Sequence, residues 1–352
     1  MSAPLVSVIV LFDRGVEGPC LNSVLSQQGV ELEVLAVVGS EQARSSLENT
    51  KNITAIVVED RNPAVRRNRA VEKAAGKYLA FIDDDAFAPR DWLKKSVDYL
   101  EENDSLAGVG GPNFLPSDSS FAETLTDLVL CTPLLGAGSR AYSGGGEPAA
   151  GRPGEVHLVN MILRKEWFER VGGLNEALGY GGEDTEFLHL LSSKEGEVVF
   201  HPEIFVYHRR RPFGFSYFRQ RLRLRGQSGR LFIAYPGIYT GSPSFWVALL
   251  APFVVLVLLI MATVINSLLP AALIIAALYI AVSIPLSLSA VGRSGNIPAW
   301  KKPLFFFLLP PALFIHLAIN LAGLWGGIIL VLVQGISHVR SELRRTPGEA
   351  GE

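Results

Sequence analysis

Apolar positions in the first part of the chain form short runs that alternate with amphipathic stretches. Four runs predict buried β-strands: Val6–Phe12, Leu32–Val38, Thr54–Val58 and Tyr78–Ile82. Pro19–Gln28 and Ala64–Ala75, which lie between them, predict helices. Alternating strands and helices at this spacing indicate βαβ units and a mostly parallel sheet, an α/β fold. Ligands of such sheets bind at the carboxyl ends of the strands, so residues that follow the runs are the first candidates for a site.

The last third of the chain carries long apolar stretches. A helix needs about 20 apolar residues to cross a hydrocarbon core of about 30 Å. Phe245–Ile265 and Pro270–Val291 meet that length without a charge. Pro303–Val333 is also uncharged, but it exceeds one span and Pro310-Pro311 interrupts it. The sequence therefore predicts a membrane region of two to four segments, ending in one tilted helix after an interfacial segment or in a re-entrant hairpin.

Basic residues flank this apolar region and also interrupt it. They occur at Arg209–Arg230, at Arg293, Lys301 and Lys302, and at Arg340, Arg344 and Arg345. The positive-inside rule places all three groups in the cytosol. Two spans followed by a re-entrant or hairpin segment satisfy the rule, whereas three plain spans do not. We therefore expect a multi-pass plasma-membrane protein with a cytosolic N-terminal domain.

The cysteines indicate the redox compartment, and the first residues argue against a signal peptide. Cys20 and Cys131 are far apart and lack metal-ligand spacing, so each is expected to be a small buried residue and not half of a disulfide, which fits a reducing compartment. The opening MSAPLVSVIVLF has neither a basic n-region nor an A-x-A site, so it is interpreted as a strand and not as a signal peptide. The net charge of -2 says little about partners.

Three adjacent carboxylates, Asp83-Asp84-Asp85, follow the run Tyr78–Ile82, and Pro89 then opens a predicted helix that continues to about Tyr99. Three such neighbours repel one another unless a cation offsets their charge. Oxygen ligands suit Mg²⁺ or Mn²⁺, which also bridge substrate phosphates. An acidic helix start, favoured by the helix dipole, explains one aspartate but not three. The pattern therefore favours a metal site.

Two further motifs flank this acidic run. Arg66-Arg67-Asn68-Arg69 lies on a predicted helix with an alanine-rich packed face, and we expect Arg66 and Arg69 on its solvated side. Gly179-Tyr180-Gly181-Gly182-Glu183-Asp184 precedes the predicted helix Thr185–Leu191. Glycines let a backbone turn tightly and approach a ligand, while two acids at a helix start also fit simple capping. Alone, the second motif fits a cap and a catalytic site equally.

Together these motifs resemble the inverting nucleotide-sugar glycosyltransferases of the GT-A fold, glycosyltransferase family two, over about residues 5–225. The matching pieces, in order, are Ser7-Val8-Ile9-Val10, Arg67-Asn68, the run that ends in Asp83-Asp84-Asp85, Gly110-Gly111-Pro112, Asn160-Met161, Gly182-Glu183-Asp184 and His208. The resemblance implies a membrane-anchored, non-processive hexosyltransferase-type enzyme. It divides the chain into a GT-A domain (1–208, Rossmann-like), a basic-aromatic juxtamembrane segment (209–243), a transmembrane region (244–336) and a polar tail (337–352).

The resemblance implies roles on the donor side. Asp83 and Asp85 would form the D-x-D pair, with Asp85 as ligand of Mn²⁺ or Mg²⁺ and Asp83 directed to the ribose or the metal. Arg67 would steady the acids or the nucleotide, and Asp84 and Asn68 belong to the same nucleotide-binding set. His208 would reach the metal or the phosphates, although a lone histidine near a strand end is more often structural.

On the acceptor side, Asp184 would be the general base that removes a proton from the attacking hydroxyl, and Glu183 would support it or contact the acceptor. The chain departs from the family pattern in two places. The usual acid after the second strand is replaced by Val37-Val38-Gly39-Ser40-Glu41, and the usual Pro and Asn after the first strand by Leu11-Phe12-Asp13. Asp13 is the candidate substitute for binding the nucleotide, and the base (uridine, guanosine or another) stays open.

The arginine-rich segment from Arg209 to Arg230, interleaved with Phe213, Phe215, Tyr217 and Phe218, suggests the acceptor. It fits an anchor on anionic membrane lipids, the phosphate of a lipid-linked acceptor, or both. We therefore expect transfer of a sugar from a nucleotide-sugar to a hydroxyl of a lipid-linked or membrane-proximal glycan, in surface polysaccharide or protein glycan biosynthesis.

Other functions explain less of the sequence. A polyprenyl-phosphate glycosyltransferase needs no base, so Gly182-Glu183-Asp184 argues against it. A processive synthase would have Q-x-x-R-W, but Gln220–Leu224 lacks the Trp, and no span precedes the N-terminal domain. A catalytically silent scaffold gives no reason for the acids, and a transporter would have more buried ionisable residues than His316. Nucleic-acid binding explains only the arginines, so no nucleic-acid partner is expected. So few spans favour a homo-oligomer.

Overall fold

The computed structural model describes residues 5–13, 18–47, 50, 52–134, 140–264, 268–294 and 297–343. Ile265, Arg344 and Arg345 of the predictions above lie outside these ranges. Contacts divide the chain into a sheet unit (Met1–Pro116, Arg140–Arg209, Ser337–Glu352) and a helical unit (Ser117–Ser139, Arg210–Ile336). Two described segments group with the unit from which they are distant in sequence: Phe121–Cys131 with the helical unit, and residues 337–343 with the sheet unit.

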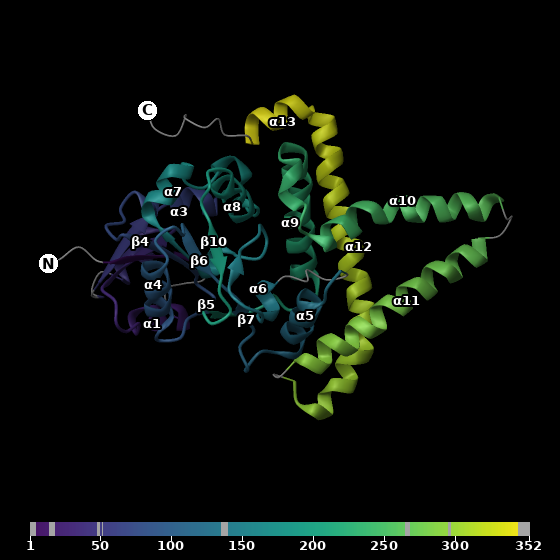
Figure 1. Cartoon of the computed structure of the whole chain (residues 1–352), viewed down its shortest axis with the longest axis horizontal. Coiled ribbons are helices and arrows are strands. Elements are labelled where there is room, and N and C mark those ends of the chain that lie inside the picture. Colours follow the sequence, from purple (N-terminus) through teal and green to yellow (C-terminus); the bar gives the residue numbers. More distant parts are fainter. Residues whose placement is uncertain are drawn as a thin grey trace. The chain divides into compact units, whose positions relative to one another are not determined.

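The sheet unit is built on an eight-stranded sheet of order β3-β2-β1-β4-β9-β6-β10-β8 (Figure 1). Its first half is parallel: β1 Val6–Phe12, β2 Leu32–Val38, β3 Ile53–Val57 and β4 Tyr78–Asp83. Its second half is mixed: β9 Met161–Arg164 runs antiparallel to β4 and β6, β6 Gly108–Gly110 and β10 Val198–Phe200 are parallel, and β8 Ala149–Ala150 is an antiparallel edge. The prediction of an α/β, mostly parallel sheet is confirmed.

Helices cover both faces of this sheet and bury its central strands, whereas the edge strands β3 and β8 are partly or fully exposed. Along β1, Val8 and Val10 face one hydrophobic cluster, and Ile9 and Leu11 face the other. Burial on both faces is the reason that these strands are continuous apolar runs without alternation. The helices of the unit are α1 Pro19–Leu25, α2 Glu41–Ser45, α3 Pro63–Val71, α4 Trp92–Glu102, α6 Arg140–Ser143, α7 Lys165–Val171, α8 Glu183–Ser193 and α13 Ile336–Leu343. Helix α4 begins at Trp92, later than predicted, after a turn in which the Pro89 carbonyl oxygen accepts from the Trp92 nitrogen.

A small second sheet stands at the carboxyl end of the parallel strands. It consists of β5 Ala86–Phe87, β11 Val206–His208 and β7 Asn113–Phe114, in the order β5-β11-β7. Buried Asn160 joins the two sheets: its amide nitrogen donates to the carbonyl oxygens of Pro112 (3.0 Å) and Ile204 (2.8 Å), and its oxygen accepts from the Trp92 indole (2.9 Å). The contact with Ile204 holds the segment that leads into β11, which ends in His208.

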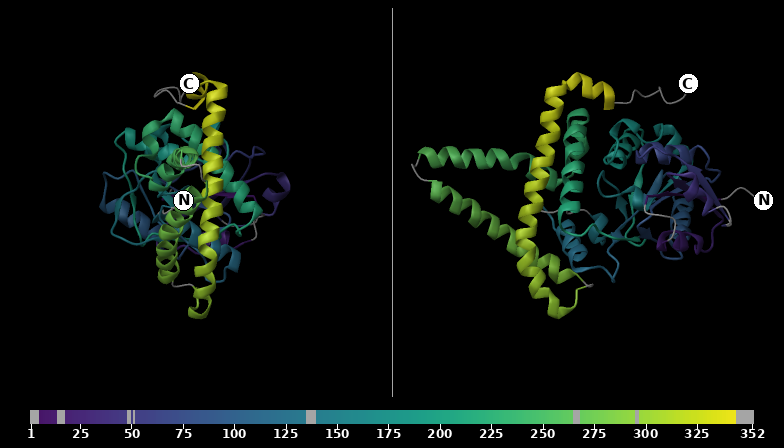
Figure 2. Two further views of the ribbon diagram at one scale, coloured as in Figure 1. Left: turned by 90° about the vertical axis from the view of Figure 1, so that its right-hand side faces the viewer. Right: turned by 180° about the vertical axis from the view of Figure 1, so that it is seen from behind.

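The helical unit contains α5 Phe121–Cys131, α9 Phe215–Ala234, α10 Pro243–Val264, α11 Leu268–Arg293 and α12 Lys302–Gln334. Helices α9 and α12 lie side by side, while α10 leads away from them and α11 returns (Figures 1 and 2). By length and composition, Ala272–Arg293 and Ala299–Gln334 are candidate membrane spans among the described residues, and Pro243–Leu258 is a shorter apolar helix.

The re-entrant hairpin considered for Pro303–Val333 is wrong, because α12 is one continuous helix that contains Pro310 and Pro311. A proline removes one helical hydrogen bond, but a helix continues through it when packing holds both sides. Here Phe305 and Leu309 before the prolines, and Leu313 after them, are buried in one cluster with α5 and the end of α11.

Candidate active site

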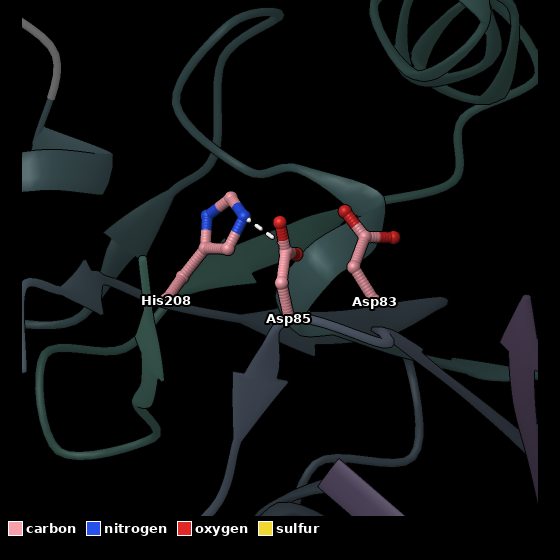
Figure 3. Close-up of side chains that lie close together, drawn as sticks. All are labelled: Asp83, Asp85 and His208. Atoms are coloured by element: carbon pink, nitrogen blue, oxygen red, sulfur yellow. Dashed lines mark ion pairs between the residues drawn. The ribbon is translucent and has the colours of Figure 1, made fainter. Parts of the chain in front are cut away.

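Two aspartates and a histidine meet at the carboxyl end of β4. Asp83 ends β4 and Asp85 follows two residues later, while strand pairing places His208 of β11 opposite Ala86. The His208 Nε2 atom lies 3.1 Å from Asp85 Oδ1, and potential ligand atoms of all three residues lie within 4.8 Å of one another (Figure 3). The three side chains are 17–34% exposed, so a ligand can reach them.

This donor set fits a divalent cation. Carboxylate oxygens are the ligands that Mg²⁺ and Mn²⁺ prefer, and an imidazole nitrogen suits a first-row transition metal. The second acidic residue of the run, Asp84, does not join the set, because its Oδ2 accepts a hydrogen bond from the Asp13 backbone nitrogen at 2.8 Å. Burial raises the pKa of the Cys20 thiol on α1. The negative charges of Asp83, Asp84 and Asp85 raise it further.

Arg67 links this acidic cluster to a second pair of acids. From the buried face of α3 its Nη2 reaches Asp83 Oδ1 at 2.9 Å, and its Nη1 reaches Glu183 Oε1 at 3.1 Å. The guanidinium is planar and 7% of the residue is exposed, so it holds the two carboxylates at a fixed separation. The end of β4 and the start of α8 are thereby connected through one side chain.

The glycine-rich loop before α8 sets the direction of the two acids. Gly181 (φ +99°) and Gly182 (φ +93°) have left-handed backbone conformations that side chains disfavour. This turn lets Glu183 Oε2 accept from the Gly181 nitrogen at 3.1 Å. Asp184 lies in the first turn of α8, half-buried, with its Oδ1 accepting from the Thr185 nitrogen at 2.7 Å. The helix N-terminus favours negative charge at this position.

Burial raises the pKa of Glu183 to about 7, and the charge of Asp184 adds to the shift while Arg67 opposes it. Folded protein therefore holds the Glu183 proton to higher pH than unfolded chain does. The protonated side chain contributes stability that is fully present below the ordinary pKa of glutamate. This contribution is lost as the pH rises through about 7.

Glu183→Gln is therefore expected to flatten the pH dependence of thermal stability between about pH 5 and pH 8. Relative to the variant, the unsubstituted protein should lose melting temperature across this range, in detergent and without metal or nucleotide. Glu166→Gln on the exposed side of α7 is the matched control and should keep the original slope. An equal slope in Glu183→Gln would contradict the assignment.

Arg66 is not on a solvated face, contrary to our expectation, whereas Arg69 is, paired with Glu72. Arg66 is 3% exposed, donates to the carbonyl oxygen of Val37 at 2.9 Å and forms an ion pair with Asp13. It therefore ties Asp13 to the ends of β1 and β2, beside the point where Asp84 binds the Asp13 backbone. Arg66, Ala70 and Ala74 are spaced four residues apart and so lie on the same face of the predicted helix. This spacing is the sequence signal that could have placed Arg66 in the interior.

Asn68 points away from the acidic cluster. Its amide nitrogen donates to the Leu174 carbonyl oxygen (2.9 Å) and to Glu176 Oε1 (2.8 Å), and its oxygen accepts from the Leu174 nitrogen (2.9 Å). These bonds use the side chain to hold the loop that leads to the glycine-rich turn. The structure therefore brings together Asp83, Asp85, His208, Arg67, Glu183 and Asp184, places Asp13 and Asp84 beside them, and gives Asn68 a loop-binding position.

Comparison with family models and with curated relatives finds glycosyltransferases. The family model for glycosyl transferase family group 2 matches residues 78–325, and the model for glycosyl transferase family 2 matches residues 18–128. The glucosyl-dolichyl phosphate glucuronosyltransferase of Haloferax volcanii is 27% identical over 179 residues, 46% of this chain and 52% of that protein. The succinoglycan biosynthesis protein ExoM of Rhizobium meliloti is 26% identical over 148 residues, 42% of this chain and 44% of that protein. The chain thus spans about half the length of these relatives.

A solved structure extends the likeness over most of the chain. It is a mannosyltransferase from Pyrobaculum calidifontis in complex with GDP-Man and Mn²⁺. The TM-score is 0.50 at 20% identity, with 91% of this chain and 87% of that chain covered. At this identity the likeness concerns the fold.

Proposed function

The chain belongs to glycosyl transferase family group 2 and has the GT-A fold. From its site we propose that it moves a sugar from a nucleotide-sugar to a hydroxyl group, with inversion at the anomeric carbon. The acceptor we propose is a lipid-linked or membrane-proximal glycan. The observation that carries the proposal is the Arg67 bridge, which sets the group Asp83, Asp85 and His208 beside Glu183 and Asp184.

On the donor side, Asp85, Asp83 and His208 would hold Mn²⁺ or Mg²⁺. When bound, such a cation stabilises the charge that develops on the leaving diphosphate. Arg67 keeps Asp83 in place and offsets part of the negative charge where the diphosphate binds. Asp13 follows the end of β1, is held by Arg66 and is joined to Asp84 through its backbone nitrogen, and it would contact the nucleotide. The mannosyltransferase of similar fold was solved with GDP-Man and Mn²⁺, which supports a donor and metal of this class.

On the acceptor side, Asp184 would take the proton from the attacking hydroxyl. The hydroxyl oxygen forms the new bond to the anomeric carbon as the bond from that carbon to the diphosphate oxygen breaks. The nucleoside diphosphate leaves with the electron pair, and the proton remains on Asp184 until water removes it. Glu183, fixed by Arg67 and the Gly181 nitrogen, orients the first turn of α8 on which Asp184 lies.

Two observations support a hydroxyl on a lipid-linked glycan. An acceptor phosphate is already an anion and needs no base, so a carboxylate at Asp184 favours a hydroxyl. The name of the Haloferax relative specifies a glucosyl-dolichyl phosphate, and that of the Rhizobium relative specifies succinoglycan biosynthesis. The apolar helices and the arginine-rich segment fit a plasma-membrane protein whose catalytic domain faces the cytosol.

Nucleoside diphosphate release tests this function. Purified protein in detergent with Mn²⁺ would receive UDP-, GDP- and dTDP-sugars, with and without a polyprenyl-linked glycan acceptor and with an EDTA control. Release from one donor that requires both metal and acceptor supports the proposal. Transfer to polyprenyl phosphate itself would favour the phosphate-acceptor alternative. No release and no metal-dependent nucleotide binding would favour a silent membrane scaffold.

A further inference from the structure

We propose that α12 does not cross the membrane but lies along its surface together with α9, and that α10 and α11 form the segment that crosses. The α9–α12 pair would then be a platform on the anionic lipid of the leaflet that faces the catalytic domain. Length and composition alone allow α12 to span. Four features of the described residues oppose that assignment.

The first feature is the close, parallel packing of α9 on α12. The Tyr217 hydroxyl lies 2.6 Å from His316 Nδ1, and Asn320 Nδ2 lies 2.7 Å from His316 Nε2, so the histidine has partners from both helices. Further along, a Cβ added at Gly327 would collide with the Gly226 carbonyl. Residue numbers rise together on the two helices, which therefore run in the same direction in contact.

The second feature is the charge of α9. Five arginines lie on this helix: Arg219, Arg221, Arg223, Arg225 and Arg230. The Arg225 Cβ lies where a side chain at Gly323 would have to fit, near the middle of α12. If α12 crossed the hydrocarbon core, α9 would carry its arginines through the same region, where each charge is strongly unfavourable. At the membrane surface, the exposed Arg219 and Arg223 can instead contact anionic headgroups.

The third feature is the path of the chain after α12. Helix α13 belongs to the sheet unit, where Asn175 Nδ2 donates to the Leu343 carbonyl oxygen at 2.9 Å. Both ends of the helical unit therefore return to the catalytic domain. Three spans, α10, α11 and α12, would leave α13 on the opposite side of the membrane, so only two of the three can cross.

The fourth feature, the position of basic residues between α11 and α12, indicates which two helices cross the membrane. Arg293, Lys301 and Lys302 lie between α11 and α12. With α10 and α11 as the spans, these basic residues remain on the same side as the catalytic domain, in agreement with the positive-inside rule. Helix α10 has 22 residues and α11 has 26, so each is long enough for a core of about 30 Å. The figures show α10 leaving the α9–α12 pair and α11 returning to it (Figures 1 and 2).

The surface of α12 fits a helix in the membrane plane. Its buried side chains, which include Leu309, His316, Leu324 and Val331, form one stripe that faces protein. The opposite stripe is exposed along the whole helix and is apolar: Leu304, Pro311, Ile315, Ala318, Ala322, Gly326, Ile329 and Val333. This stripe would face the acyl chains while the arginines of α9 lie at the level of the headgroups.

Spin labels on the exposed stripe test the orientation of α12. Leu304→Cys, Ile315→Cys, Ala322→Cys and Val333→Cys would carry a nitroxide in vesicles with anionic lipid, and depth would be measured from oxygen and nickel-complex accessibility. Leu304 and Val333 are about 44 Å apart along the helix axis. A surface helix gives one shallow depth at all four positions. A spanning helix gives deep labels at Ile315 and Ala322 with shallow ends, which would overturn the proposal, as would labels exposed to water throughout.

Helix α11 provides the matched control, because Leu273→Cys, Leu278→Cys and Leu288→Cys lie on exposed apolar positions and should show a depth gradient. The unsubstituted chain, which retains Cys20 and Cys131, sets the background label. Sidedness gives a second readout with a membrane-impermeant maleimide. Ser294→Cys and Ser337→Cys should react from the same side of sealed vesicles. Reaction of Ser294→Cys and Ser337→Cys from opposite sides would refute the arrangement.

Discussion

Asp184→Asn is expected to lower the rate of sugar transfer by about 100- to 10,000-fold while nucleotide-sugar binding stays close to that of the unsubstituted protein. The substitution keeps the size of the side chain and an oxygen that can accept from the Thr185 nitrogen. It removes the negative charge that, in the proposed mechanism, takes the acceptor proton. The loss should therefore appear in the rate of transfer at saturating donor and acceptor, measured as nucleoside diphosphate release.

The matched control is Glu166→Gln, an equal change of charge on the exposed side of α7 in the same unit. It should transfer sugar at the original rate. Transfer by Asp184→Asn within tenfold of the original rate would exclude Asp184 as the base. A phosphate acceptor, which needs no proton removed, would then become the leading interpretation.

The sequence was sufficient for the parallel half of the sheet. Strands β1 and β2 begin and end at the predicted residues, because burial on both faces requires a continuous apolar run that polar residues bound. The other half could not be found in this way. Strands β6, β8, β9 and β10 have two to four residues, and β9 pairs with β4 across about eighty positions of sequence. Such pairing depends on tertiary contacts that no local pattern records.

The motifs named the candidate residues, and the resemblance implied that Arg67 steadies the acids or the nucleotide, but the link from Arg67 to Glu183 was not predicted. Asp83, Asp85 and His208 could be named because acids at a strand end have a recognisable chemistry, and the structure places their ligand atoms together. The bridge from Arg67 to Asp83 and Glu183 joins residues that are 116 positions apart at most. Charge patterns along one helix do not reveal such a partner. For the same reason Arg66 was expected in solvent, although it is bound to backbone carbonyls inside the sheet unit.

In the membrane region, the sequence pattern predicts the helices but not their orientation. Apolar length predicted the helices α10, α11 and α12 well, but it does not separate a helix that crosses a membrane from one that lies on it. That distinction depends on the neighbour. Helix α12 has the arginine-rich α9 along its second half and α5, with Asp127, near its first half. Asp127 forms an ion pair with Arg210 at 2.8 Å, although burial raises the pKa of the Asp127 carboxyl.

Asp85→Asn is expected to abolish most metal-supported donor binding and to lower transfer by at least about 100-fold. Asp85 Oδ1 lies beside His208 Nε2 in the cluster that fits a divalent cation, and an amide cannot supply the charge of a carboxylate. Calorimetric titration of the nucleoside diphosphate, with Mn²⁺ and then with EDTA, measures the effect. The unsubstituted protein should lose affinity in EDTA, whereas the variant should bind weakly under both conditions.

Asp84→Asn makes the same change one residue away. It distinguishes the effect of the position of a carboxylate from the effect of the total charge of the acidic run. The Asp84 carboxylate accepts from the Asp13 nitrogen and is not one of the three ligand candidates. Nucleotide binding by the Asp84→Asn variant should therefore remain dependent on Mn²⁺. Equal loss of metal dependence in both variants would mean that the summed charge of the run, not the geometry at Asp85, attracts the cation. Asp184→Asn, by contrast, should bind donor and metal normally and fail only in transfer. These three outcomes should differ because we propose separate tasks for the two groups of acids that Arg67 joins. Asp83 and Asp85 would hold the cation that binds the leaving diphosphate, and Asp184 would activate the acceptor.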